Sequence, residues 1–244
     1  MHSLSVALGF LIGLALGLLG GGGSILTVPV FVYVLGFGPK ESIAMSLAVV
    51  GVTSLAGAIG HWRQGHVNFR VAAIFGPLAM VGSYLGTRLA TRLTGAEQLT
   101  IFGSVMLVAA VFMFRGVRSD EGGGKSTLPV AFTSAEGLVV GTLTGLVGVG
   151  GGFLIVPSLV WAGLQMVDAV GTSLLTIVMN CAVGFYGYLG HVQIAWIPMA
   201  LVMAGALPGI ATGTYATRFV PPRILRRIFA VLILFVAIYI LIST

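Results

Sequence analysis

Two glycine-rich interruptions lie inside apolar sequence: Gly17-Leu-Leu-Gly20-Gly-Gly-Gly-Ser24-Ile-Leu-Thr-Val-Pro29 and Gly145-Leu-Val-Gly148-Val-Gly-Gly-Gly152-Phe-Leu-Ile-Val-Pro157. Each glycine costs about 1 kcal/mol relative to alanine in a helix, so a run of them ends a helix inside lipid. The apolar stretches around them, 4–36 and 128–165, are also too long for one ordinary membrane span. We expect each stretch to form two short helices, 4–19 with 24–36 and 128–147 with 152–165.

The rest of the chain has the composition of a membrane protein. Of its 244 residues 57% are hydrophobic and 7% are charged, whereas a soluble domain carries about 25% charged residues. Further apolar segments follow at 42–60, 69–90, 97–115, 168–189, 193–217 and 223–243. The expected fold is an all-α polytopic membrane protein with about 8–10 membrane segments. Residues 1–20 lack the basic region and cleavage site of a signal peptide, so we expect a mature N-terminus.

The net charge of +6 does not indicate nucleic-acid binding. The lysines and arginines lie in short connections between apolar segments, where basic residues anchor helices and set their orientation. The sequence has no basic stripe with interleaved aromatic residues. Its single cysteine, Cys181, excludes an intramolecular disulfide and a cysteine-rich metal cluster. We expect no metal, no cofactor and no nucleic-acid partner.

The two halves of the chain repeat the same landmarks in the same order. After the glycine runs, the matching pairs are Glu41 with Asp168, Ser46-Leu47 with Ser173-Leu174, Gly65-His-Val-Asn68 with Gly190-His-Val-Gln193, and Ala90-Thr-Arg92 with Ala216-Thr-Arg218. A polar stretch divides the halves, and its glycines and charges cannot lie in hydrocarbon. We expect a first transmembrane repeat over 1–116, a polar linker over 117–126 and a second transmembrane repeat over 127–244.

Each glycine break has two possible geometries. It can interrupt a single crossing, or it can form the tip of a hairpin that enters the membrane and returns. The hairpin inverts the halves and collects nine of the twelve lysines and arginines on one side, whereas the single crossing collects seven. The positive-inside rule therefore favours inverted repeats with both chain termini outside. Lys40, Arg88 and Arg92 are then the basic residues of the outer side.

The glycine breaks are the expected binding site. A helix that restarts inside the membrane directs free N–H groups and the positive end of its dipole toward the interior. Two such ends can bind an anion without a basic side chain, and glycine lets the ligand approach the backbone closely. The expected binding residues are Gly20, Gly21, Gly22, Gly23, Ser24, Gly148, Gly150, Gly151 and Gly152. The earlier glycines Gly13, Gly17, Gly141 and Gly145 are better explained by tight helix packing.

Three polar residues inside apolar spans are candidates to add hydrogen bonds to a substrate: Thr53, Ser173 and Asn180. The alternative for the two hydroxyl groups is a bond to a carbonyl of their own helix, which is the commoner case. An amide costs more to bury without a partner, so Asn180 is the hardest of the three to explain as a structural residue.

Several charged residues near helix ends have two interpretations. Glu41 and Asp168 precede helices, where compensation of the helix dipole is favoured over binding of a coupling ion. Arg88 and Arg92 lie at a helix end, where each can extend to the membrane interface or guide an anion. For His66 and His191, interfacial hydrogen bonding is favoured over metal ligation because no second ligand lies at the right spacing. Metalloprotease, nucleophile-elbow and Walker motifs are absent from the sequence, so we expect neither an enzyme nor a built-in energy source.

The double glycine motif with its proline resembles the TauE/SafE family, the sulfite-exporter group of membrane permeases. Gly17-x-x-Gly20-x-Gly-Gly-Ser24 with Pro29 and its second copy carry the resemblance, which extends over nearly the whole chain. Relatives often have an acidic residue in the Gly-x-Val turn, where this chain has Asn68 and Gln193. A charged role for the turn is therefore not expected here.

The resemblance implies transport of sulfite, thiosulfate, an organosulfonate or another small anion. We expect a secondary transporter, working in export or uptake, in the inner membrane of a bacterium or archaeon. Its partners would be the lipid bilayer and a small anionic substrate bound near the midplane. The alternatives are an anion channel and a membrane scaffold that transports nothing. The coupling proton or ion, the direction of transport and the oligomeric state stay open.

Overall fold

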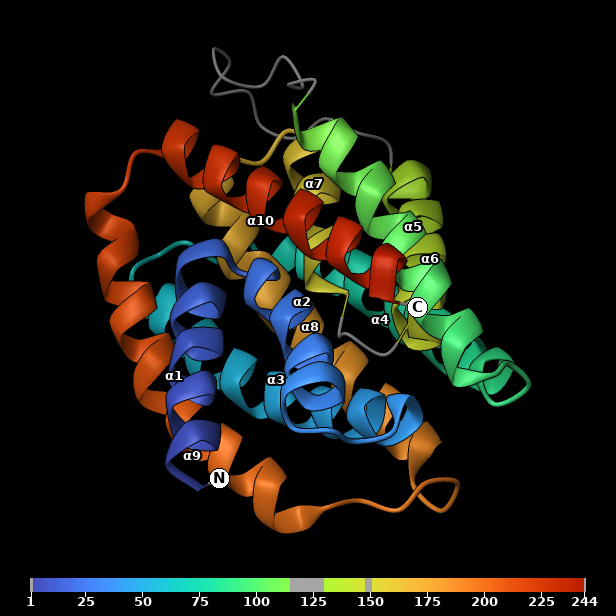
Figure 1. Ribbon diagram of the computed structural model, residues 1–244. Helices are drawn as coiled ribbons and strands as arrows, with labels where there is room; N and C mark the ends of the chain where they lie inside the picture. The colour runs from blue at the N-terminus through green and yellow to red at the C-terminus, as the bar shows by residue number, and fades with distance from the viewer. Residues whose placement is uncertain (1, 115–129, 148–150, 244) are drawn as a thin grey trace.

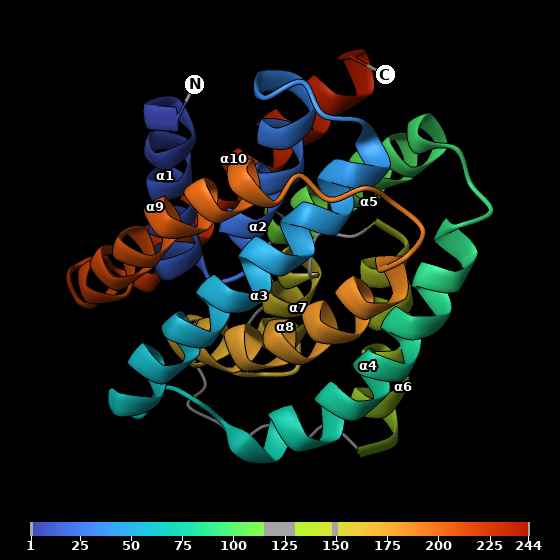
Figure 2. The ribbon, with the colours of Figure 1, turned by 90° about the horizontal axis from the view of Figure 1, so that it is seen from below.

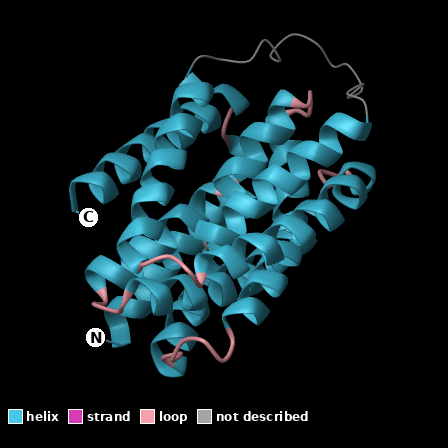
Figure 3. Ribbon diagram, turned by 90° about the vertical axis from the view of Figure 1, so that its right-hand side faces the viewer, coloured by secondary structure: helices cyan, strands magenta, loops and turns pink. Residues whose placement is uncertain are grey.

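The computed structural model describes residues 2–114, 130–147 and 151–243. These ranges contain helices joined by short connections and no strand (Figure 3). The first half contains α1 (His2–Leu19), α2 (Gly22–Pro29) continued by a π-helical turn (Val30–Val34), α3 (Pro39–Arg63), α4 (Phe69–Ala90) and α5 (Gly95–Phe114). The second half contains α6 (Val130–Val147), α7 (Gly152–Trp161), α8 (Met166–Tyr188), α9 (Trp196–Ala216) with a 3-10 turn (Thr217–Phe219), and α10 (Pro222–Ser243).

The helix boundaries confirm the expected fold class. Each half has two short helices around its glycine break and then three longer ones, as the apolar segments predict. Five helices, α1, α3, α4, α8 and α9, are long and apolar enough to cross a membrane by length and composition. The linker predicted at 117–126 and the candidate residues Gly148 and Gly150 lie outside the described residues.

The glycine break of the first half is a hairpin. Gly20 has a φ of +63°, a conformation that glycine adopts without strain. The chain then returns along α1, because a Cβ on Gly23 would overlap the backbone of Leu16 and lie 2.7 Å from the carbonyl oxygen of Ile12 (Figure 1). In one continuous crossing, Gly23 and Ile12 would be about 16 Å apart along the axis.

The second break has the same character. Gly151 has a φ of +71°, and a Cβ at this position would overlap the Thr144 side chain. Seven residues of straight helix would separate these two positions by about 10 Å. The chain therefore turns back at both breaks, and the hairpin is the geometry that the structure adopts.

The half-helices pack across the two halves of the chain. α1 lies against α9, and its stripe Gly9, Gly13 and Gly17 meets the stripe Gly205, Gly209 and Gly213. In the same way α6 lies against α4, where Gly137, Gly141 and Gly145 face Phe75, Ala79 and Ser83. A Cβ on most of these glycines would overlap backbone of the neighbouring helix. The expectation that the earlier glycines serve close helix packing is confirmed.

Two of the remaining contacts join equivalent helices of the two halves: α3 crosses α8, and α5 lies along α10 (Figure 2). In addition α3 contacts α9, and α8 contacts α4. Exchanging the halves leaves the first two contacts unchanged and turns the other two into one another. The helices therefore form two bundles, α1–α3–α9 and α4–α6–α8, that meet where α3 crosses α8.

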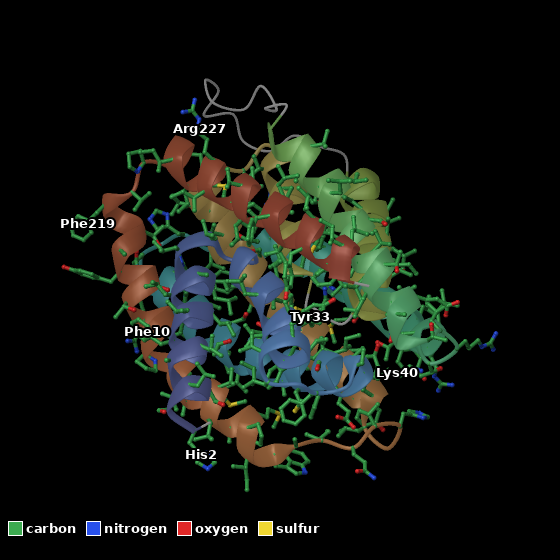
Figure 4. The ribbon with its side chains drawn as sticks, viewed as in Figure 1. His2, Phe10, Tyr33, Lys40, Phe219 and Arg227 are labelled. Carbon is green, nitrogen blue, oxygen red and sulfur yellow. The ribbon has the colours of Figure 1, made fainter. Side chains whose placement is uncertain are left out.

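The ends of the molecule carry different connections. Both chain termini lie on one side (Figure 2), and Figure 4 places Lys40 and Arg227 toward opposite ends. The inverted arrangement predicts this separation of Lys40 from Arg227, whereas a parallel arrangement would put them on one side. The orientation of the halves across a bilayer stays a prediction.

Candidate functional site

The tips of the two hairpins touch near the centre of the fold. A Cβ on Gly21 would overlap the backbone of Gly152, and a Cβ on Gly152 would overlap Gly21 in return. Gly21 is the N-cap of α2, and Gly152 is the first residue of α7. The backbone contact leaves no room for a ligand directly between these two residues.

Neither helix start has a side-chain cap. The first N–H groups of an α-helix have no intrahelical acceptor, and the helix dipole adds positive potential there. Ser24 does not supply the missing acceptor at Gly21, because its hydroxyl donates to the Gly21 carbonyl at 2.6 Å. Two uncapped helix N-termini therefore face the interior beside their mutual contact.

One face of α8 supports both tips. A Cβ on Gly20 would lie 3.1 Å from the Ser173 hydroxyl, and a Cβ on Gly152 would lie 2.5 Å from Ile177 Cδ1. Asn180 follows Ile177 by three residues, so it lies on the same face about one helical turn further along. The structure thus places Ser173 and Asn180 on the helix face that holds the hairpin tips.

The predicted hydroxyl groups bind their own helices. Thr53 donates to the Val49 carbonyl at 2.6 Å, and Ser173 donates to the Val170 carbonyl at 2.8 Å. Both side chains are fully buried. This is the alternative that the sequence left open for hydroxyl groups, and a ligand would have to displace these bonds to use them as donors.

Asn180 behaves differently from the hydroxyl residues. Its side chain is fully buried, and within the described residues neither its amide nitrogen nor its amide oxygen has a hydrogen-bond partner. A buried polar group without a partner costs about 1–3 kcal/mol. The Ser83 hydroxyl donates to the Asn180 backbone carbonyl at 3.3 Å, which leaves the amide available. Asn180 therefore has the property expected of a ligand-binding side chain.

The carbonyl ends of the half-helices have partners that the sequence did not reveal. The Gly17 carbonyl accepts from Thr217 at 3.1 Å and lies 3.5 Å from His61 Nε2. The Leu146 carbonyl accepts from Gln98 at 3.1 Å, and the same amide nitrogen donates to Tyr188. These polar residues of apolar spans complete the ends of α1 and α6. Their positions within apolar segments could have marked them as candidates in the sequence. Their partners could not be predicted, because they are distant in sequence.

The charged candidates lie at the ends of helices. Glu41 and Asp168 occupy the first turns of α3 and α8, where they compensate the helix dipole. His66 Nδ1 lies 2.9 Å from Asp168 Oδ1, so this histidine makes the interfacial hydrogen bond that was expected of it. Arg88 lies in the last turn of α4 and contacts Tyr84.

The fold and the hairpin site define a class of protein: an α-helical integral membrane protein with the same order of helices in both halves and paired hairpins that meet inside it. A model of the sulfite exporter TauE/SafE family matches residues 5–240. The chain belongs to this family.

The relatives are described as transporters. A probable membrane transporter protein of Xylella fastidiosa strain 9a5c is 34% identical over 97% of this chain and 94% of its own length. The probable membrane transporter protein YdhB of Bacillus subtilis is 28% identical over 89% of this chain and 91% of its own. One from Methanocaldococcus jannaschii, MJ0441, is 26% identical over 82% and 80%. No solved structure matches the chain significantly.

Proposed function

We propose that this protein is a secondary transporter of a small anion such as sulfite, thiosulfate or an organosulfonate. The buried, unpartnered amide of Asn180, on the face of α8 that contacts both hairpin tips, is the observation that supports this function most directly. Family membership supports the class of substrate.

The donors at this site suit an anion. The amide nitrogen of Asn180 and the first N–H groups of α2 and α7 all donate hydrogen bonds, and the two helix dipoles add positive potential. The described lysines and arginines lie at helix ends or in connections instead. Because these donors are neutral N–H groups, the bound anion forms no ion pair with a lysine or arginine. The protein can therefore release it again.

The contact between the hairpin tips indicates where a substrate would bind. Because Gly21 and Gly152 touch, the substrate would lie beside them on the side of Asn180, or would enter as the tips separate. The proposed binding residues at the tips are Gly20, Gly21, Gly22, Gly23, Ser24, Gly151 and Gly152, with Thr53, Ser173 and Asn180 alongside.

The packing across the halves indicates which bodies would move. α1 and α9 are interlocked by glycine stripes, and α6 is held against α4 in the same way. A sequence repeat cannot move as a unit without breaking these contacts. Alternating access would therefore come from rocking of the bundles α1–α3–α9 and α4–α6–α8 at the crossing of α3 and α8, where Gly51 faces Cys181.

Counterflow in proteoliposomes tests the function. Vesicles loaded with unlabelled sulfite or thiosulfate should accumulate the same labelled anion in a saturable way, and Asn180→Thr should abolish this exchange. Thr212→Val is the matched control, because Thr212 is an exposed residue of α9 that bonds only to its own helix. Current without counterflow would indicate a channel, and no flux of any tested anion would indicate a scaffold. Exchange by Asn180→Thr at the wild-type rate would refute the site.

A further inference from the structure

A cavity of about 400 Å³ lies between the C-terminal ends of α4 and α8. Its polar lining residues are Tyr84, Thr87, Arg88, Thr91, Tyr186 and His191. The cavity combines a cation with hydroxyl groups and an imidazole, which is a chemistry that fits an oxyanion.

Arg88 is held in place at this cavity. Its Nη2 donates to the Tyr84 hydroxyl at 2.5 Å, and its Cζ lies 5.1 Å from the centre of the Tyr84 ring. No described carboxylate forms an ion pair with this guanidinium. Tyr84 therefore orients the Arg88 fork while most of its N–H donors stay available for a ligand.

Some of the other lining side chains already donate hydrogen bonds to backbone carbonyls, and others do not. Thr87 donates to the Ser83 carbonyl at 2.8 Å, and Thr91 donates to the Arg88 carbonyl at 2.8 Å. Within the described part of the chain, the side chains of His191 and Tyr186 make no hydrogen bond or ion pair. Arg88, His191 and Tyr186 are thus the groups that could bind an anion in the cavity.

The cavity and the proposed substrate site both lie along α8. Two residues of the cavity lining, Gly187 of α8 and Thr87 of α4, pack so closely that a Cβ on Gly187 would lie 2.6 Å from Thr87 Cγ2. Asn180 lies seven residues earlier on α8, about 10 Å deeper along the helix axis. One turn before Thr87, Ser83 of α4 bonds to the Asn180 carbonyl.

We propose that Arg88, with His191 and Tyr186, forms a peripheral oxyanion site in this cavity at the C-terminal ends of α4 and α8. Its ligand is a small anion with two or more oxygen acceptors, matched to the bidentate guanidinium. A free sulfur oxyanion and a lipid phosphate share this chemistry. For the free anion the proposal rests on the transport function, because the site would then concentrate substrate before it enters.

Residue-resolved modification of arginine tests the site without measuring transport. Phenylglyoxal would be applied to purified protein in detergent, and modification of Arg88 and Arg92 would be followed by peptide mass spectrometry. Sodium sulfate is the probe, and sodium chloride at equal ionic strength is the control for screening. Sulfate should slow modification of Arg88 several-fold and leave Arg92, which lies outside the cavity, unchanged.

A second arm identifies the source of the oxyanion. Protection of Arg88 in nanodiscs of phosphatidylglycerol, but not by sulfate, would support the site and assign it to lipid. Equal modification of Arg88 and Arg92 under all conditions would overturn it. If Arg88 is protected by sulfate but no anion is transported, the transport function fails while this site stands. In transporting protein, Arg88→Gln should raise the KM for the anion and spare the maximal rate, whereas Arg92→Gln should change neither.

A separate set of contacts distinguishes the two ends of the molecule. At one end the turn 64–68 is fastened to α8: His66 pairs with Asp168, and the Asn68 N–H donates to Thr172 Oγ1 at 2.9 Å. A Cβ on Gly171 would overlap the carbonyl oxygen of His66, so only glycine permits this approach.

The equivalent turn 190–193 lacks this fastening. When the two halves are aligned by pairing Ser46 with Ser173, Ala44 takes the position of Gly171 and Met45 takes the position of Thr172. The methyl group of alanine prevents the close approach, and methionine offers no hydroxyl acceptor. A cavity of about 350 Å³ separates the regions instead, with Lys40, Glu41, His191 and Gln193 in its lining.

We infer that the turn 64–68 is a latch that closes one end of the molecule, while the end near His191 is the open one. Hydrogen–deuterium exchange tests this assignment. In wild-type protein, residues 64–68 should exchange several-fold more slowly than residues 190–193, and Thr172→Val or Gly171→Ala should remove the difference. Met45→Leu, which conserves the volume of this buried side chain, is the control and should change neither turn. Equal exchange of both turns in wild-type protein, or slow exchange of 64–68 in both latch variants, would overturn the assignment.

Discussion

Asn180→Thr should abolish binding and yet make the empty protein more stable. At the equivalent position of the first half the chain carries Thr53, whose hydroxyl bonds to the carbonyl four residues earlier. A threonine at position 180 can do the same on α8. The substitution therefore removes an amide whose nitrogen and oxygen have no hydrogen-bond partner. It introduces a hydroxyl that bonds to a carbonyl of its own helix.

The expected gain follows from the cost of the buried amide. An unpartnered buried polar group costs about 1–3 kcal/mol, and the smaller side chain gives some of this gain back as lost contacts. A net stabilisation of about 1–2 kcal/mol corresponds to a rise in Tm of several degrees, at about 2–4 °C per kcal/mol for a chain of this size. Loss of substrate binding acts in the opposite direction, since a saturating ligand at 100 Kd adds about 2.7 kcal/mol to a binding-competent protein.

The assay is a thermal melt with a thiol-reactive fluorogenic dye. Cys181 is the single cysteine and is fully buried, so its labelling reports unfolding. The ligand is methanesulfonate, because a sulfonate has no nucleophilic sulfur to consume the dye. Wild-type protein should melt at a higher temperature as methanesulfonate is added, whereas Asn180→Thr should melt high and show no ligand dependence. A lower Tm of the empty variant would mean that Asn180 has a structural partner. A methanesulfonate shift retained by the variant would show that the anion binds elsewhere.

Three further substitutions test the hairpins and their supports. Gly21→Ala should abolish transport and lower Tm, because its Cβ overlaps the backbone of Gly152. Gly38→Ala is the control and should be tolerated in the same transport and melting assays. Gly38 has a φ of −60°, and a Cβ there would meet only Glu41 at 3.7 Å. Gln98→Leu should cost about 1–3 kcal/mol, measured as a fall in Tm, because the Leu146 carbonyl and the Tyr188 hydroxyl lose their shared partner. Thr94→Ala should cost about 0.5–2 kcal/mol by removing a capping box in which Thr94 and Glu97 exchange hydrogen bonds, and faster amide exchange in the first turn of α5 would report it.

The sequence predicts local structure well because its signals are local. Glycine runs end helices wherever they occur, and apolar segments of spanning length predict the helices to within a few residues. Pairing of the helices depends on contacts between residues far apart in the chain. Nothing in α1 alone indicates that its glycine stripe meets α9 rather than a helix of its own half. The sequence suggested tight packing at Gly13 and Gly17, but it could not name the partner.

The same limit applies to the candidate site. The sequence placed Thr53, Ser173 and Asn180 at membrane depth, but it could not show which of them would bind their own helices. A helical hydroxyl can donate a hydrogen bond to a carbonyl three or four residues earlier, as Thr53 and Ser173 do, whereas the longer amide of Asn180 has no such partner here. His61 and Gln98 were missed for a related reason, since each completes a carbonyl of a helix distant in sequence.

Comparison of the two halves shows which positions are alike and which differ. The positions that build the hairpins are alike in both halves, namely Gly17 with Gly145 and Pro29 with Pro157. Such positions shape backbone that both halves need, so they can stay equal. A binding site and a direction of opening require the halves to differ. Thr53 is self-satisfied while Asn180 is not, and Ala44 excludes the close approach that Gly171 permits. Because Asn180 differs from Thr53, only the second half contributes an unpartnered amide to the proposed site. Because Gly171 differs from Ala44, only the turn 64–68 packs closely against the helix beside it, and the two ends of the molecule differ.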